Sequence, residues 1–329
     1  MKVAIYGAGA IGGWIGARLA QTGCEVGVVA RGATLEALRM HGLRLEASTG
    51  SAPTEVVSVA VRASADPADL GVQDLVIVAV KAPAMADVAT AIGPLIGPDT
   101  IVLTAMNGVP WWFFEGFGDK YAGTRLKAID PQGAIARAIP ARHIIGCVVH
   151  ASCSANSPGF VKQHFGNKLI VGEPSGEKTA RIKRLVTLLE QAGFETVLSD
   201  QIQKDAWYKL WGNMTVNPVS AMTGATTDLI MGDDLVRGFI SRVMLEAREI
   251  GARIGIPIEQ QPEDRHAVTR KLGSFKTSML QDVEAGKPVE LDALVTVVKE
   301  LGELTQVPTP FTDALLGLSR LHARVHGLY

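Results

Sequence analysis

The sequence Gly7-Ala8-Gly9-Ala10-Ile11-Gly12 decides the fold of the first half of the chain. It directly follows an apolar run at residues 3–6 and opens a helical stretch at residues 11–22. In such a strand-turn-helix unit Gly7 permits the tight turn, Gly9 lets the backbone approach a pyrophosphate, and Gly12 lets helix and strand pack closely. The helix N-terminus then presents unpaired N–H groups to the phosphates. We therefore expect residues 7–12 to bind a dinucleotide, the alternative being a glycine turn needed for packing alone.

Alternation of apolar runs and helical stretches continues through the first half of the chain. Continuous apolar runs are typical of strands buried on both faces. Their alternation with helices predicts an α/β fold with a Rossmann-type doubly wound parallel sheet. We expect strands at residues 3–6, 25–30, 75–80, 100–104, 144–151, 160–171 and 195–198, and helices at residues 11–22, 85–92 and 181–192.

The end of the second expected strand indicates which dinucleotide binds. Sites for NAD generally place a carboxylate there to bind the ribose 2′-hydroxyl. This chain instead has Arg31 at that position. A carboxylate would repel a 2′-phosphate, whereas a guanidinium pairs with it. The sequence therefore predicts a preference for NADP(H), the alternative being a solvated surface arginine.

Residues 200–329 show helical patterns without a strand pattern. We expect helices over residues 200–214, 228–250, 262–281, 291–304 and 309–325. Pro218 should break or kink the chain after the first of these helices. The sequence thus predicts two domains, a Rossmann-type domain at residues 1–199 and an all-α substrate domain at residues 200–329.

Composition excludes several classes of protein. The 329 residues carry 32 basic and 33 acidic side chains, so no general attraction for nucleic acid or acidic membranes is expected. The longest apolar runs fall far short of the roughly 20 residues that a membrane span requires. Three cysteines without disulfide or zinc spacing fit a reduced, cytoplasmic compartment and no metal site. The absence of Gly-x-Ser-x-Gly and Walker sequences argues against hydrolases and P-loop proteins.

A lysine and two asparagines form the first candidate cluster for chemistry. Lys209 and Asn213 are four residues apart and share a helix face, and Asn217 follows one turn later. Together they could bind and polarise a carbonyl group. The neighbouring tryptophans, Trp207 and Trp211, should partly desolvate Lys209, which favours release of its proton. An ordinary solvated lysine is the alternative.

Four further residues are candidates for ligand contact. Lys81 and Asn107 follow the ends of expected parallel strands, where open α/β sheets bind ligands. Ser278 and Glu290 lie in the helical half, where spacing alone leaves both binding and ordinary helix-terminus roles open. The histidines have no acid or cysteine at metal-ligand spacing, so we expect core or surface roles for them.

Taken together, these motifs resemble the ketopantoate reductase family over nearly the whole chain. The most specific are Asn217-Pro218 after the Lys209 and Asn213 pair, and the run from Ser278 to Asp282. The resemblance implies NADPH-dependent reduction of 2-dehydropantoate to pantoate, a step of pantothenate biosynthesis. It implies that Lys209 is the general acid. It assigns substrate binding to Asn213, Asn217, Ser278 and Glu290, and places Lys81 and Asn107 beside the nicotinamide and the substrate.

Two positions depart from the family pattern. Thr227 and Phe275 stand where the family commonly has asparagines, so the pocket should be less polar on that side. A paralogous enzyme that reduces another 2-oxo acid is therefore one alternative, and a non-catalytic NADP-sensing protein is another. The expected partner is a small 2-oxo acid. A homodimer is compatible with the sequence, which does not determine the oligomeric state.

Overall fold

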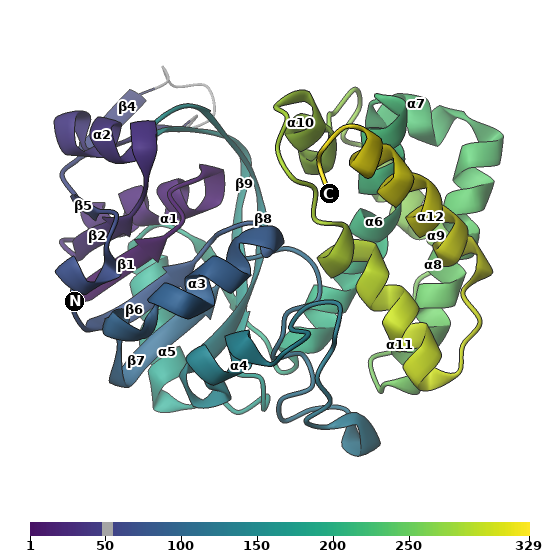
Figure 1. The fold of residues 1–329 in the computed structure, drawn as a ribbon, viewed down its shortest axis with the longest axis horizontal. Coiled ribbons are helices and arrows are strands. Elements are labelled where there is room, and N and C mark those ends of the chain that lie inside the picture. The colour runs from purple at the N-terminus through teal and green to yellow at the C-terminus, as the bar shows by residue number, and fades with distance from the viewer. Residues whose placement is uncertain (48–54) are drawn as a thin grey trace. The chain divides into compact units, whose positions relative to one another are not determined.

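The computed structural model describes residues 1–47 and 55–329, which divide into two compact units (Figure 1). The first unit comprises residues 1–106 and 133–202, and the second comprises residues 107–132 and 203–329. Each unit has a hydrophobic core of its own. The units therefore follow the change in composition near residue 200, with one segment of the first half joined to the helices.

That segment, residues 107–132, is held to the helical unit by both packing and hydrogen bonds. Phe113 and Phe114 are buried in the helical core, where Phe113 lies 6.2 Å from Trp207 between ring centroids. The backbone N–H groups of Lys127 and Ala128 donate to the carboxylate of Glu300 at 2.7 and 2.8 Å. The sequence predicted that these residues belong to the Rossmann-type domain, whereas the structure groups them with the helices. No local sequence pattern reveals this long-range packing.

The first unit is built on one ten-stranded sheet with the order β4-β3-β9-β8-β7-β6-β1-β2-β5, and β10 pairs with β9. The strands are β1 (Lys2–Tyr6), β2 (Glu25–Val29), β3 (Leu43–Ala47), β4 (Glu55–Val59), β5 (Arg62–Ser64), β6 (Gln73–Val78), β7 (Ile96–Thr104), β8 (Ile144–Ser157), β9 (Phe160–Gly172) and β10 (Glu195–Leu198). Its helices are α1 (Ala10–Gln21), α2 (Gly32–His41), α3 (Met85–Ala91), α4 (Ala134–Ala138) and α5 (Ala180–Gln191).

The sheet is mixed, although most of its strands pair in parallel as predicted. Strand β1 pairs in parallel with β2 and β6, and β7 pairs in parallel with β6 and β8. The exceptions are the antiparallel pairs β8 with β9 and β3 with β4. Strands β8 and β9 are joined by Pro158 and Gly159, a connection that can only reverse the chain, because a parallel pair needs a crossover of about a dozen residues.

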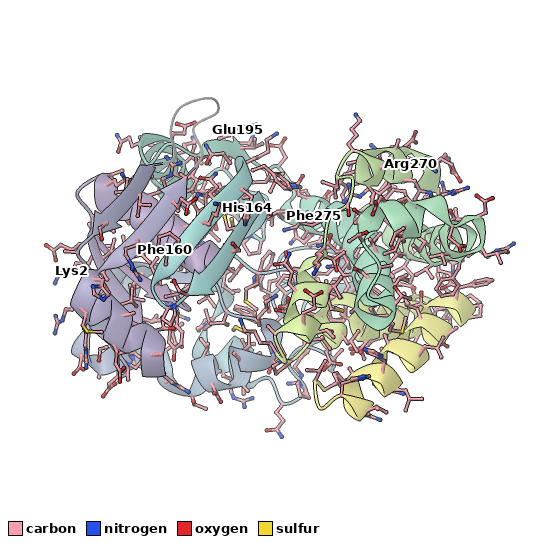
Figure 2. All side chains as sticks on the ribbon, turned by 90° about the horizontal axis from the view of Figure 1, so that it is seen from above. Lys2, Phe160, His164, Glu195, Arg270 and Phe275 are labelled. Carbon is pink, nitrogen blue, oxygen red and sulfur yellow. The ribbon has the colours of Figure 1, made fainter. Side chains whose placement is uncertain are left out.

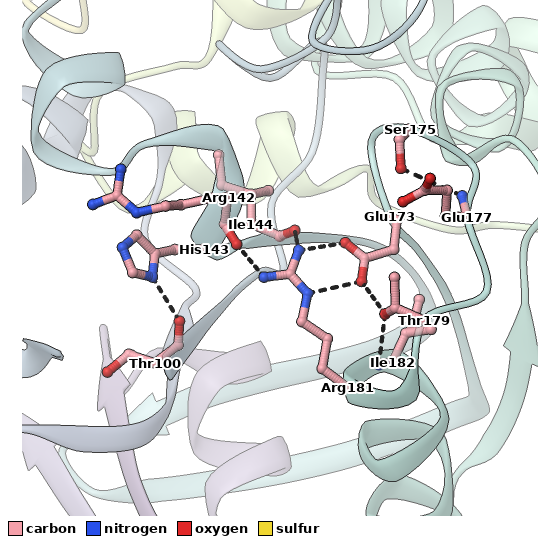
Figure 3. Close-up of polar contacts among 10 residues, drawn as sticks. All are labelled: Thr100, Arg142, His143, Ile144, Glu173, Ser175, Glu177, Thr179, Arg181 and Ile182. Atoms are coloured by element: carbon pink, nitrogen blue, oxygen red, sulfur yellow. Dashed lines mark hydrogen bonds and ion pairs between the residues drawn. The ribbon is translucent and has the colours of Figure 1, made fainter. Parts of the chain in front are cut away.

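A partly buried ion pair between Arg181 and Glu173 ties the end of β9 to the beginning of β8 (Figure 3). Glu173 is almost fully buried and accepts hydrogen bonds from Arg181 and, at 2.6 Å, from the hydroxyl of Thr179. Arg181 also donates to the backbone carbonyls of Arg142 and Ile144. Because a buried carboxylate is stable only when it is paired and hydrogen-bonded, this network is structural.

In the described residues 203–329, every regular element is helical, as predicted. The helices are α6 (Ile202–Thr223), α7 (Thr227–Gly232), α8 (Asp234–Arg253), α9 (Pro262–Arg270), α10 (Ser278–Glu284), α11 (Val297–Thr305) and α12 (Pro310–Val325), with a π-helical turn at Asp292–Thr296 before α11. No helix among the described residues combines the length and apolar character that crossing a membrane requires.

Three expected helix boundaries are wrong. Helix α6 continues through Pro218 to Thr223, because buried residues on both sides of the proline hold it in the core. The expected helix at residues 228–250 is two helices, since Asp233 caps α8 by accepting from the backbone of Leu235 and Val236. The expected helix at residues 262–281 likewise divides, because Thr277 caps α10.

Candidate active site

The three glycines of the turn between β1 and α1 differ in what surrounds them. Gly7 has φ +100°, and a Cβ there would lie 2.7 Å from Cγ1 of Val80. A Cβ on Gly12 would lie 2.0 Å from the carbonyl oxygen of Gly7. A Cβ on Gly9 would meet nothing within 4 Å. Gly7 and Gly12 are therefore required by the turn itself, whereas the open space over Gly9 fits a phosphate group at the helix N-terminus.

Arg31 and Lys81 follow β2 and β6, the two strands that pair with β1. Both side chains are thus carried at the carboxyl ends of strands, on the same edge of the sheet as the glycine turn. The Arg31 side chain is 67% exposed, and its Nη1 lies 3.6 Å from Oδ2 of the equally exposed Asp87. Such exposed pairs contribute little to stability, so the guanidinium can exchange this partner for a phosphate.

The helical unit brings Lys209 together with Asn107. The Lys209 ammonium donates a hydrogen bond of 2.8 Å to Oδ1 of Asn107, and the contact is partly buried. Lys209 lies on α6, and Asn107 opens the segment that packs on the helices. The sequence placed Asn107 after a strand and Lys209 on a helix, but no pattern linked the two.

The backbone beside Asn107 is fixed by the π-helical turn. Gly108 has φ +84°, and a Cβ there would lie 2.4 Å from the carbonyl oxygen of Ala293. The same oxygen accepts a hydrogen bond of 3.0 Å from the N–H of Val109. Single π-helical turns occur frequently at functional sites. Here the turn presents the Ala293 carbonyl to the segment that carries Asn107.

The remaining predicted substrate residues also lie in the helical unit. Asn213 is partly exposed on α6 one turn after Lys209, and Asn217 is buried a turn further on. Ser278 is the first residue of α10, and Glu290 is a buried carboxylate three residues before Ala293. Lys209 and Asn107 are the predicted residues whose mutual contact the structure establishes.

The two departures from the family pattern contact each other. The Thr227 hydroxyl donates to the carbonyl of Gly273 at 2.6 Å and accepts from the N–H of Phe275 at 3.3 Å. The backbone N–H of Thr227 donates to the Phe275 carbonyl at 3.0 Å. Thr227 is buried, so its hydroxyl holds the segment before α10 in place. The sequence marked both positions as unusual, but their contact required the tertiary structure.

A tyrosine contact beside the π-helical turn was missed at the level of sequence. The Tyr329 hydroxyl donates to Oδ1 of Asp292 at 2.7 Å, and the N–H of Val289 donates to the carbonyl of Leu328 at 3.0 Å. Burial and the hydrogen bond to Asp292 raise the pKa of Tyr329. These contacts hold residues 289–292, including Glu290, and no sequence signal could have revealed them.

The hydrogen bonds described above involve none of the described cysteines or histidines. Cys24, Cys147 and Cys153 form no disulfide with any described residue, and burial raises the pKa of Cys153 to about 12. His164 lies exposed on β9, 2.9 Å from the hydroxyl of Ser154 (Figure 2), and His266 is buried. Among the described residues, no cluster of histidine, cysteine and acidic side chains could hold a metal ion.

Comparison with known proteins identifies the family. Residues 3–176 match the family model described as ketopantoate reductase PanE/ApbA, and residues 201–323 match the model of its C-terminal domain. The 2-dehydropantoate 2-reductase of Mesorhizobium japonicum is 43% identical over 332 residues, with both chains covered completely. A candidate ketopantoate reductase from Ralstonia solanacearum MolK2 has a crystal structure that superimposes with a TM-score of 0.94, at 55% identity, covering 100% and 99% of the two chains.

More distant relatives share the fold. The ternary structure of a D-mandelate dehydrogenase with NADH and anilino(oxo)acetate superimposes with a TM-score of 0.84 at 21% identity, covering both chains completely. A dimeric ketopantoate reductase from Staphylococcus aureus superimposes with a TM-score of 0.75 at 19% identity, covering 99% and 100% of the two chains. Fold and relatives define the class of this chain as an oxidoreductase that uses a nicotinamide cofactor. Within that class, the chain belongs to the ketopantoate reductase family.

Proposed function

We propose that this protein is a 2-dehydropantoate 2-reductase that uses NADPH to form pantoate. The observation that carries the proposal is the hydrogen bond between Lys209 and Asn107, because it holds an ammonium group at a fixed point beside an amide. Full-length similarity to the Mesorhizobium japonicum enzyme supports the substrate.

The glycine turn and Arg31 support the choice of cofactor. The open space over Gly9 fits the pyrophosphate, and the exposed guanidinium of Arg31 fits a 2′-phosphate. Lys81, on the same edge of the sheet, would lie on the nicotinamide side. When bound, NADPH supplies the hydride that the keto carbon of the substrate accepts. The absence of a carboxylate at position 31 favours NADPH over NADH.

Lys209 supplies the proton in this proposal. As the keto carbon gains a hydride, its oxygen develops negative charge, and the Lys209 ammonium donates a proton to that oxygen. Asn107 accepts a hydrogen bond from the ammonium and so fixes the direction in which this group of three N–H donors points. Asn107 is therefore a positioning residue whose own amide can also contact the substrate.

Polar groups of the helical unit would bind the rest of the substrate. Asn213, Asn217 and Ser278 can hydrogen-bond its carboxylate, and the buried Glu290 can accept a hydrogen bond from its hydroxyl. A specific observation favours a second candidate function, the reduction of a less polar 2-oxo acid. The Thr227 hydroxyl is hydrogen-bonded to the backbone of Gly273 and Phe275, and position 227 has no side-chain amide that could bind a substrate hydroxyl.

A substrate panel tests the proposal directly. NADPH oxidation is followed by its absorbance with 2-dehydropantoate, its 4-deoxy analogue and bulkier 2-oxo acids, using purified protein. We expect the highest kcat/KM with 2-dehydropantoate. A higher kcat/KM for the deoxy or bulkier acids would instead assign the second function, and no turnover with any acid would favour an NADP-sensing protein.

Two further properties belong to this proposal. The three cysteines form no disulfide with any described residue, which supports a reducing, cytoplasmic compartment. The dimeric state of the Staphylococcus aureus relative supports a homodimer for this chain too.

A further inference from the structure

Helix α12 is apolar on two opposite faces. One face is buried in the helical core and comprises Thr312, Leu315, Leu316, Ser319 and Ala323. The opposite face carries Leu318, Leu321 and Val325, whose exposed fractions are 62%, 61% and 73%. A helix at a protein surface normally has polar residues there. The corresponding positions of α5, for example, are Lys183, Arg184 and Glu190.

The exposed apolar residues follow the spacing of a helix-pairing seam. Ala314, Leu318, Leu321 and Val325 are separated by four, three and four residues, which is the heptad spacing of paired helices. We call these four residues the α12 stripe. In Figure 2 the pale yellow α12 runs along an outer edge of the helical unit. The stripe is therefore an exposed apolar patch of a kind that marks an interaction surface.

Gly317 lies beside the stripe and supports a close partner. A glycine in a helix interior destabilises the helix relative to alanine. A Cβ added at Gly317 would meet no described atom within 4 Å, so no contact among the described residues requires a glycine there. Its small size would instead let a second backbone approach the helix.

The charged residues beside the α12 stripe are complementary to those of a second, antiparallel copy of the helix. Asp313 near the start of α12 and Arg320 and Arg324 near its end lie along one flank of the helix. In an antiparallel pair related by a two-fold axis, Asp313 of one helix faces the end of the other helix that carries Arg324. The same axis brings Ala314 opposite Val325 and Leu318 opposite Leu321. A surface that matches itself in this way is the signature of a two-fold interface.

We propose that the α12 stripe is the homodimer interface of this protein, with α12 of one copy packed antiparallel on α12 of the other. The inference rests on the homodimer proposed above and assigns its surface. A membrane surface fits less well, because interfacial helices carry mainly basic residues along their polar face, and Asp313 interrupts that pattern.

Oligomeric state under substitution tests the proposal. In sedimentation equilibrium we expect a dimer for the unaltered chain at micromolar concentrations. Leu321→Glu places one carboxylate of each copy in the seam and should raise the dimer Kd by about 100-fold or more. Leu235→Glu is the matched control, since Leu235 is 88% exposed on α8, and should leave the Kd unchanged. Unaltered melting temperatures would show that both variants fold.

Three results would overturn the proposal: a monomeric parent chain at about 100 μM, a Leu321→Glu variant that stays dimeric, or a Leu235→Glu variant that dissociates. The reductase assay remains an independent measurement. An active monomer would refute the interface and leave the proposed function standing. An inactive dimer with the predicted sensitivity to Leu321→Glu would do the reverse.

Disulfide cross-linking tests the direction of the helices. The double variant Ala314→Cys with Val325→Cys should form a cross-linked dimer on mild oxidation, because the two positions face each other in the antiparallel pair. Neither single variant should form a cross-link. The introduced cysteine of one copy would lie about 16 Å along the helix axis from the same cysteine of the other copy, at 1.5 Å per residue. The parent chain, with its three native cysteines, gives the background. Cross-linking of the single variants, or of none, would contradict the antiparallel seam.

Discussion

The Lys209 ammonium and the Asn107 amide oxygen, which belong to residues 102 positions apart, are joined by a hydrogen bond of 2.8 Å. The bond depends on the placement of residues 107–132 against the helical unit. The carbonyl of Ala293 and the carboxylate of Glu300 both accept backbone hydrogen bonds from that segment. The position of the Lys209 ammonium, the proposed proton donor, therefore depends on elements far from it in the sequence.

Lys209→Ala tests the proton donor. We expect kcat to fall by about 10²–10⁴-fold, the usual contribution of a general acid. The Kd of NADPH, measured by fluorescence titration, should change little. Lys204→Ala provides the control, since Lys204 is exposed on the same helix and should leave kcat unaltered. Near-normal turnover of Lys209→Ala would reduce Lys209 to a structural lysine.

Gly108→Ala tests the support beneath Asn107. An alanine at position 108 would have to adopt a φ of +84°, which residues with a side chain rarely do. Its Cβ would also lie 2.4 Å from the carbonyl oxygen of Ala293, so the backbone must shift. A displacement of about 1 Å can cost roughly 100-fold in rate, and we expect kcat to fall by about that factor. Gly123→Ala is matched to it, because Gly123 has φ +73° in the same segment but open space around its Cβ. Equal losses of kcat in both variants would show only general strain.

Arg31→Ala tests cofactor choice. Loss of a charge-assisted hydrogen bond to the 2′-phosphate should weaken NADPH binding by roughly 10- to 100-fold and leave NADH binding nearly unchanged. The measurement is the Kd of each cofactor by isothermal titration calorimetry. Arg39→Ala, on α2 close in sequence, should alter neither Kd. Equal affinity of the unaltered protein for both cofactors would remove the basis for assigning NADPH.

Glu290→Gln tests recognition of the substrate hydroxyl. A buried hydrogen bond to a charged group contributes about 1.5–3 kcal/mol, so kcat/KM for 2-dehydropantoate should fall roughly 10-fold or more. The 4-deoxy analogue should be indifferent to the substitution, since it lacks the hydroxyl. If both acids lose the same factor, Glu290 acts on the fold and not on the hydroxyl.

His266 should make the stability of the helical unit depend on pH. Burial lowers the pKa of His266, an effect opposed by Glu263 and reinforced by Arg270 and Arg237. The unfolded chain therefore binds a proton at higher pH than the folded chain. We expect the free energy of unfolding to decrease as pH falls from about 7 through the ordinary histidine range near 6.5. Urea unfolding of His266→Gln should show a smaller decrease, whereas exposed His164→Gln should behave like the parent chain.

Much of the helical half was predicted in kind but not in its boundaries. The expected helices at residues 228–250 and 262–281 each contain two helices, because Asp233 and Thr277 cap new helix starts. Both residue types are common at helix N-termini, so these signals were present in the sequence. At Pro218 the error is the opposite one, because a helix end was predicted where α6 continues. Burial of α6 in the core outweighs the local cost of a proline within the helix.

The sequence by itself determined the Rossmann-type unit, the helical character of the second half and the presence of Lys209 as a candidate donor. These follow from local properties: the conformations open to Gly7, the close packing at Gly12, and the periodicity of apolar residues. Only the tertiary structure decided that Asn107 meets Lys209 and that Thr227 meets Phe275. Such contacts join residues far apart in the chain, and they exist only because burial of the helical core brings their segments together.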